Sequence, residues 1–129
     1  MNVADYMEKV YPDKPCWPLI YDVLATERGL VSVVCKTVTG TVRDAVRAFA
    51  IELTKGEHGF RQIDAPVDFA VLLLGRTTTI GIHHAGIYYD GKVLHALSGE
   101  GGQIILHQDL SSLLEEYQLV QYWFKDADE

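Results

Sequence analysis

The histidines of residues 84–96 have a spacing that suits a catalytic pair. This stretch reads HAGIYYDGKVLHA, and its central Asp-Gly dipeptide favours a two-residue type I′ turn between antiparallel strands. With that turn, Gly86 lies opposite His95, and His84 and His95 share one sheet face as diagonal neighbours, about 7–8 Å apart at Cα. The glycine leaves room for the second ring. A three-residue turn would put the two rings on opposite faces, so the prediction depends on the register.

Cys16 is the nucleophile that this pair would serve. Pro18 is tolerated only in the first turn of a helix, which predicts a helix start near Cys16, and Gly29 marks the helix end. A thiol at that start lies beside free backbone N–H groups, which favour the thiolate and would stabilise an oxyanion. His84 would take the thiol proton and His95 would hold its ring in one tautomer. This requires the helix to pack on the sheet face that bears His84.

The histidines, cysteines and glycines of the chain could also form a zinc site, a disulfide or a phosphate-binding loop, but their spacing is less typical of these sites. A zinc site would draw on four histidines, namely His83, His84, His95 and His107. It lacks a helical H-E-x-x-H spacing and a cysteine pair, and the glycine-rich loop at 99–102 lacks the strand-to-helix context of a phosphate site. Cys35 lies in an apolar Val-Val context typical of a buried thiol, and nothing favours a disulfide between it and Cys16. We therefore expect neither metal nor cofactor.

Hydrophobic periodicity and turn residues predict one α+β domain over residues 1–129. Helices are expected at 16–28, at 41–55 and in a short segment capped by Asp109. Strands are expected at 69–74, in both arms of the histidine hairpin, at 103–107 and at 117–124. The remaining segments are 1–14 (irregular or one helical turn), 30–38 (strand or continued helix) and 57–67 (loop). N-terminal helices then pack on a mostly antiparallel sheet of about five strands.

Charge and hydropathy exclude several classes of partner. The net charge is −7 and the sequence contains no cluster of Lys and Arg residues, so binding to nucleic acid is not expected. No apolar run has the length of a membrane span, and the first residues lack the basic start of a secretory signal. We therefore expect a protein with no signal peptide and no membrane partner, cytoplasmic when made, which leaves a cell by lysis or within a larger particle.

Four motifs follow one another in a set order along the chain. PCWPLI at 15–20 begins the first long helix, and PVDFAVLL occupies 66–73. HAGIY and LHA then occupy 84–88 and 94–96. In order and spacing these motifs resemble the NlpC family of papain-like cell-wall cysteine peptidases, especially its short phage-tail members. The resemblance covers the chain except for the segment 41–55. Because the cysteine precedes the histidines, the chain differs from the permuted lecithin-retinol-acyltransferase relatives.

The resemblance implies a papain-like fold and hydrolysis of amide bonds in the peptide stems of peptidoglycan, commonly next to D-glutamate. It makes Cys16 the nucleophile, His84 the base and His95 the third polar residue. The implied partners are the peptidoglycan peptide and phage tail proteins, and the implied location is the virion or, after release, the cell wall. The negative charge will not draw the protein to an anionic wall, so targeting depends on a carrier.

Two positions depart from the family pattern. The Asp that usually precedes the cysteine is Pro15 here. The family's upstream Tyr, which assists the oxyanion site, has two counterparts, Tyr6 and Tyr11, and neither lies in a glycine-rich segment. Trp17 beside the nucleophile is a further candidate for contact with substrate, by stacking. The departures favour an alternative hypothesis, a catalytically silent tail-assembly or wall-binding module, and a third is an acyltransferase or toxin on the same scaffold.

Overall fold

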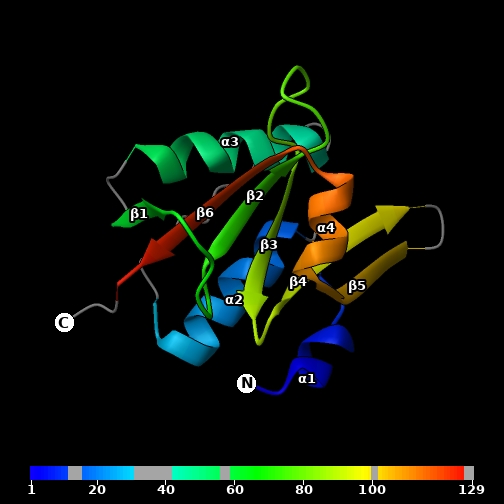
Figure 1. Ribbon diagram of the computed structural model, residues 1–129. Helices are drawn as coiled ribbons and strands as arrows, with labels where there is room; N and C mark the ends of the chain where they lie inside the picture. The colour runs from blue at the N-terminus through cyan, green and yellow to red at the C-terminus, as the bar shows by residue number, and fades with distance from the viewer. Residues whose placement is uncertain (12–15, 31–41, 56–58, 100–101, 127–129) are drawn as a thin grey trace.

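The computed structural model describes the ranges 1–11, 16–30, 42–55, 59–99 and 102–126, and at Cys16 it describes the backbone alone. In chain order the elements are α1 (Val3–Met7), α2 (Cys16–Arg28), α3 (Val42–Thr54), β1 (Phe60–Ile63), β2 (Val71–Gly75), β3 (His84–Tyr89), β4 (Lys92–Gly99), β5 (Gly102–Asp109), α4 (Leu110–Glu116) and β6 (Leu119–Lys125). Within these ranges the strands form a sheet in the order β1-β6-β2-β3-β4-β5, with antiparallel neighbours throughout (Figure 1). No helix in the described ranges combines the length and the apolar composition needed to cross a membrane.

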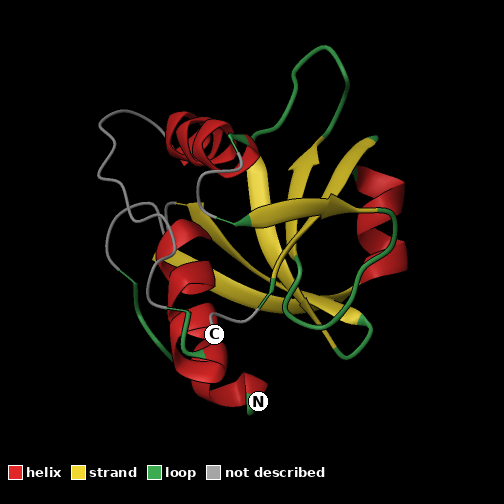
Figure 2. Ribbon diagram, turned by 90° about the vertical axis from the view of Figure 1, so that its left-hand side faces the viewer, coloured by secondary structure: helices red, strands yellow, loops and turns green. Residues whose placement is uncertain are grey.

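Helices cover both faces of the sheet. Figure 2 shows α2 and α3 on one side of the strands and α4 on the other. The core on the α2 side joins apolar side chains of both helices to Leu73 and its neighbours in the sheet. A smaller core on the α4 side includes Leu72, Leu74 and Tyr117. Strand β2 supplies both cores, because alternate residues point to opposite faces and every residue of the strand is buried. The prediction of a central strand buried on both faces is confirmed.

The ends of α2 lie where the sequence predicts them. The helix begins at Cys16, and Pro18 occupies its first turn, where a missing N–H costs no hydrogen bond. Gly29 follows the helix in the left-handed conformation, with a φ of 67°. The N–H of Gly29 donates to the carbonyl of Ala25 at 3.0 Å, which closes an αL motif, and the N–H of Leu30 donates to the carbonyl of Leu24 at 3.2 Å. The start of α2 is thus set by local sequence.

The histidine hairpin has the predicted register. Tyr89 pairs with Lys92, and the turn residues Asp90 and Gly91 have φ values of 52° and 79°, as a type I′ turn requires. The ladder between β3 and β4 ends at the pair formed by Ile87 and Leu94. Beyond that pair β3 continues along β2, and β4 continues along β5. Figure 1 shows β4 and β5 turning away from β2 and β3, so the sheet opens beyond this pair, on the side away from the hairpin turn.

The α+β class is confirmed, but the sheet has six strands instead of about five. The additional strand, β1, lies in the segment 57–67 that was expected to be a loop. It forms because Phe60 is buried in the α2-side core while its backbone pairs with Lys125 of β6. That pairing joins residues far apart in the sequence, which local patterns do not predict. Of the segment 30–38, only Leu30 belongs to the described residues, so Cys35 lies outside them. Pro15 also lies outside the described residues.

Candidate active site

His84 and His95 form a hydrogen-bonded pair at the point where β3 and β4 part. His84 is the first residue of β3, and its Nε2 lies 2.9 Å from Nδ1 of His95 on β4. The rings meet edge to face, with centroids 5.0 Å apart and planes at 78°. Both side chains are buried, with 5% and 2% of their surface exposed. The predicted adjacency of the two rings is confirmed.

Gly86 makes this approach of the strands possible. A Cβ atom on Gly86 would lie 2.6 Å from Cγ1 of Val93, closer than side chains tolerate, and 3.1 Å from Cβ of His95, which is tighter than most Cβ contacts. The glycine of the HAGIY motif therefore has a steric role, because a larger side chain at this position would push the two strands that carry the histidines apart.

Two further side chains hold the pair. Nε2 of His95 lies 3.1 Å from Oε1 of Gln108 on β5. The ring of Tyr117, which follows α4, stacks on the ring of His84 with centroids 5.9 Å apart and planes at 16°. The two imidazoles are thus fixed from the strand side and from the α4 side.

Burial keeps both imidazoles neutral near pH 7. Desolvation by burial, together with the neighbouring charges of His95, His83 and Arg76, lowers the pKa of His84 to about 3. Burial also lowers the pKa of His95, although its hydrogen bond to Gln108 works in the opposite sense. A neutral imidazole has one protonated and one unprotonated nitrogen, so each ring can donate one hydrogen bond and accept another.

The body of α2 packs on the sheet face opposite to the histidine pair. Ala85 and Ile87 belong to the α2-side core, whereas His84 pairs with Leu74 of the α4-side core. The helix contributes four buried residues to the α2-side core, namely Leu19, Ile20, Val23 and Leu24. The expectation that this helix packs on the histidine face is therefore wrong. The physical reason is the alternation along β3, which gives the apolar stripe of the helix an apolar surface on the other face.

The helix α2 nonetheless packs on both strands of the histidine hairpin, β3 and β4. Its first turns lie behind these strands in Figure 1. Beyond the pair formed by Ile87 and Leu94 the two strands no longer pair with each other, and the histidine rings cross the opening. The side chain of Cys16 lies outside the described part of the chain, so the third predicted catalytic residue is placed through its backbone alone.

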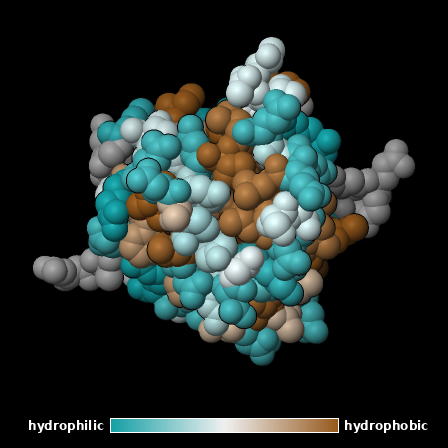
Figure 3. All heavy atoms as spheres, viewed as in Figure 1, coloured by the Kyte–Doolittle hydropathy of each residue, from teal (hydrophilic) through white to brown (hydrophobic). Residues whose placement is uncertain are grey.

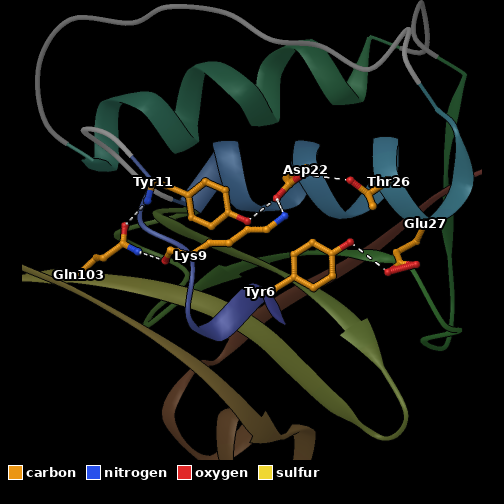
Figure 4. Close-up of polar contacts among 7 residues, drawn as sticks. All are labelled: Tyr6, Lys9, Tyr11, Asp22, Thr26, Glu27 and Gln103. Carbon is orange, nitrogen blue, oxygen red and sulfur yellow. Dashed lines mark hydrogen bonds and ion pairs between the residues drawn. The ribbon is translucent and has the colours of Figure 1, made fainter. Parts of the chain in front are cut away.

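The candidate tyrosines bind along α2, away from its start (Figure 4). The hydroxyl of Tyr11 lies 2.6 Å from Oδ2 of Asp22, and that of Tyr6 lies 3.0 Å from Oε1 of Glu27. At 1.5 Å of rise per residue these acceptors are about 9 and 16 Å along the helix from Cys16. Burial raises the pKa of Tyr6 to about 12, and burial together with Asp22 raises the pKa of Tyr11, so both hydroxyls stay protonated.

A polar clamp ties the N-terminal segment to α2 and β5. Nζ of Lys9 lies 2.8 Å from Oδ2 of Asp22, the carboxylate that Tyr11 also contacts. The side-chain amide of Gln103 accepts from the backbone N–H of Tyr11 at 2.9 Å and donates to the carbonyl of Lys9 at 2.7 Å (Figure 4). Partial burial of Asp22 works to raise its pKa, but hydrogen bonds from Lys9, Tyr11 and Thr26 outweigh it and lower the pKa. This clamp is structural.

Trp17 is part of the core. Its ring packs against Phe49 of α3, with centroids 3.5 Å apart, and 7% of the residue is exposed. Within the described residues its Nε1 is the buried side-chain polar atom that has no hydrogen-bond partner. The ring is thus engaged between two helices, and the structure does not present it to a ligand by stacking.

Sequence reasoning missed Gln108 and Tyr117 as neighbours of the histidines. The predicted strand ended at residue 107, one short of Gln108, and β5 runs on to Asp109. Gln108 pairs with Val93, which places it diagonally to His95. A longer strand prediction would have found this contact. Tyr117 reaches His84 only through the packing of α4 against the sheet, for which the sequence carries no local signal.

Among the described residues, no group of three or more His, Cys, Asp or Glu side chains is arranged to hold a metal ion. On the face that carries the histidine pair, hydrophobic residues gather over the strands beside α4 (Figure 3).

Comparisons with protein-family models, with curated proteins and with solved structures found no match to the chain.

Proposed function

We propose that the protein is a cysteine peptidase that hydrolyses amide bonds in the peptide stems of peptidoglycan. The observation that carries the proposal is the buried hydrogen bond between His84 and His95. It joins the histidines of HAGIY and LHA, two of the four motifs that resemble those of the NlpC peptidases. The first of the four motifs, PCWPLI, places Cys16 at a helix start. The fold proposed with it is the papain-like arrangement, in which a helix start meets the opening of an antiparallel sheet.

The reaction follows from the chemistry of the three residues. The thiol proton of Cys16 passes to His84, and Sγ attacks the carbonyl carbon of the scissile amide. Backbone N–H groups at the start of α2 stabilise the oxyanion. The C–N bond then breaks, and the amine leaves with the proton from His84. Water, deprotonated by His84, hydrolyses the thioester and restores the thiol.

The low pKa of His84 sets a condition on the first step. A desolvated neutral imidazole is a weak base by itself, because burial opposes the imidazolium form. A thiolate formed beside it offsets that cost, since opposite charges in contact stabilise each other in a poorly hydrated site. We therefore expect the proton transfer to produce a thiolate–imidazolium pair, with His95 stabilising the cation from the other side.

Digestion of purified peptidoglycan tests the proposal. The wild-type protein is expected to release stem peptides with new amino termini, which mass spectrometry identifies together with the bond that was cut. Cys16→Ala is expected to abolish the release, and Cys35→Ala, the matched substitution of the other cysteine, is expected to retain it. Absence of cleavage by the wild type, or undiminished cleavage by Cys16→Ala, would overturn the proposal.

A second candidate is a catalytically silent tail-assembly or wall-binding module of the same fold. The packing of α2 on the face opposite to His84 favours it, as do the tyrosine hydroxyls that lie away from the helix start. Thiol reactivity separates the candidates in Cys35→Ser, where Cys16 is the remaining thiol. An activated Cys16 reacts with iodoacetamide at least about one pH unit below an ordinary thiol, whose pKa is about 8.5, and a silent one does not.

The proposed setting is a phage tail or a released wall hydrolase. The motifs that carry the resemblance are those of short phage-tail members, and the net charge of −7 requires a carrier to bring the protein to an anionic wall. Co-purification of the protein with tail proteins from intact virions tests this setting independently of its activity.

A further inference from the structure

Three side chains form a continuous hydrogen-bonded row across the open edge of the sheet. Nε2 of His84 on β3 lies 2.9 Å from Nδ1 of His95 on β4, and Nε2 of His95 lies 3.1 Å from Oε1 of Gln108 on β5. Three ring nitrogens take part, namely Nε2 of His84, Nδ1 of His95 and Nε2 of His95, and each has one partner within the row. The direction of every hydrogen bond is therefore determined once the direction of one bond is known.

The oxygen of Gln108 determines that direction. An amide oxygen only accepts hydrogen bonds, so Nε2 of His95 must carry its proton. Because burial keeps His95 neutral by lowering its pKa, its Nδ1 is then unprotonated and accepts. His84 must donate to it through Nε2–H. The pKa of His84 is also lowered, and the neutral ring then has its unprotonated nitrogen at Nδ1.

We infer that Gln108 is a positioning residue that sets the tautomers of both histidines, so that Nδ1 of His84 carries the lone pair that accepts the thiol proton. The catalytic meaning of the inference rests on the proposed function, whereas the tautomers themselves do not. After proton transfer the His84 imidazolium still donates through Nε2 to His95, so no hydrogen bond in the row has to reverse. The opposite direction would leave a proton on Nδ1 of His84, and that ring would be unable to act as a base.

Nitrogen-15 NMR of the imidazole rings tests the inference directly, because the two ring nitrogens of each tautomer differ in chemical shift. In the uniformly labelled full chain at pH 7, both histidines are expected as the Nε2–H tautomer. Gln108→Leu, which removes the acceptor, is expected to shift His95 and His84 toward the Nδ1–H tautomer. Gln108→Glu retains an oxygen acceptor and is expected to keep the wild-type tautomers, and Gln62→Leu, at an exposed position of β1, is the matched control.

Peptidoglycan cleavage supplies the second readout. Gln108→Leu is expected to lower kcat by about 10- to 100-fold with little change in KM, less than the loss of a complete general base, and Gln108→Glu is expected to restore it. Unchanged tautomers in Gln108→Leu overturn the inference, whatever the activity. If the wild-type protein cleaves nothing, the proposed function fails, and the spectra alone decide whether Gln108 sets the tautomers.

Discussion

Gly86 and His95 lie so close across the hairpin that a Cβ atom on the glycine would be 3.1 Å from Cβ of the histidine. The same added atom would be 2.6 Å from Cγ1 of Val93 and 3.0 Å from the carbonyl oxygen of Leu94. The carbonyl belongs to the backbone and cannot turn away. The proximity of the two imidazoles therefore depends on the absence of a side chain at this one position.

Gly86→Ala is expected to destabilise the protein by about 1–3 kcal/mol, the usual cost of forcing an extra carbon into a packed interior. It is also expected to lengthen the contact between His84 and His95, and so to reduce cleavage beyond what the loss of stability explains. Urea unfolding measures the first effect, and imidazole NMR measures the second. Gly29→Ala is the comparison, because its added Cβ meets no atom within 4 Å and tests backbone strain alone. Equal stability of Gly86→Ala and the wild type would contradict the steric argument.

Stability is expected to fall as the pH drops below about 6.5. Burial lowers the pKa of His84 to about 3 in the folded protein, whereas an unfolded chain has the ordinary value near 6.5. Between these values the unfolded state binds the additional proton, so the free energy of unfolding decreases with falling pH by up to about 1.4 kcal/mol per pH unit for this group. Above about pH 6.5 both states are neutral at this residue, and its contribution is constant.

Urea titrations at pH 7 and pH 5 measure this dependence. His84→Gln removes the titrating ring and is expected to flatten the pH profile, while His107→Gln, at a histidine for which no other role is proposed, is expected to leave most of the slope. A wild-type profile that is flat between pH 7 and pH 5 would show that His84 titrates normally in the folded state.

Tyr11→Phe is expected to cost about 1.5–3 kcal/mol of stability, because it removes the 2.6 Å hydrogen bond to the Asp22 carboxylate, a charged acceptor. Tyr6→Phe removes a similar bond, 3.0 Å long, to the more exposed Glu27 and is expected to cost less. Neither change is expected to lower kcat of the folded protein, since both hydroxyls contact α2 well beyond its start. A Tyr11→Phe variant of unchanged stability but greatly reduced kcat would place that hydroxyl in the catalytic site.

His95→Asn and His95→Leu are expected to differ in activity. The asparagine retains a side-chain oxygen that can accept the hydrogen bond from Nε2 of His84, whereas the leucine leaves that buried group without an acceptor. The leucine variant is therefore expected to lose more kcat than the asparagine variant, by about 10-fold or more, which corresponds to about 1.4 kcal/mol or more at the transition state. Kinetics with a defined stem peptide make the comparison, and equal losses would mean that His95 acts by filling space alone.

Local patterns in the sequence determined the parts of the site that depend on neighbouring residues. The Asp-Gly dipeptide at 90–91 specifies a two-residue turn, because few other residues adopt positive φ at both positions, and the turn then fixes the register that joins His84 to His95. Pro18 and Gly29 specify the ends of α2 in the same way, since each restricts or permits backbone angles at its own position.

Only the tertiary structure decided which surfaces these elements meet. The helix that begins at Cys16 packs on the face of Ala85 and Ile87, and its amphipathic pattern is equally compatible with either face of an open sheet. The contacts of Gln108 with His95 and of Tyr117 with His84 likewise join segments that are distant in the chain. Such choices depend on the free energy of burying whole surfaces against one another, and that free energy belongs to the assembled fold and not to any short stretch of residues.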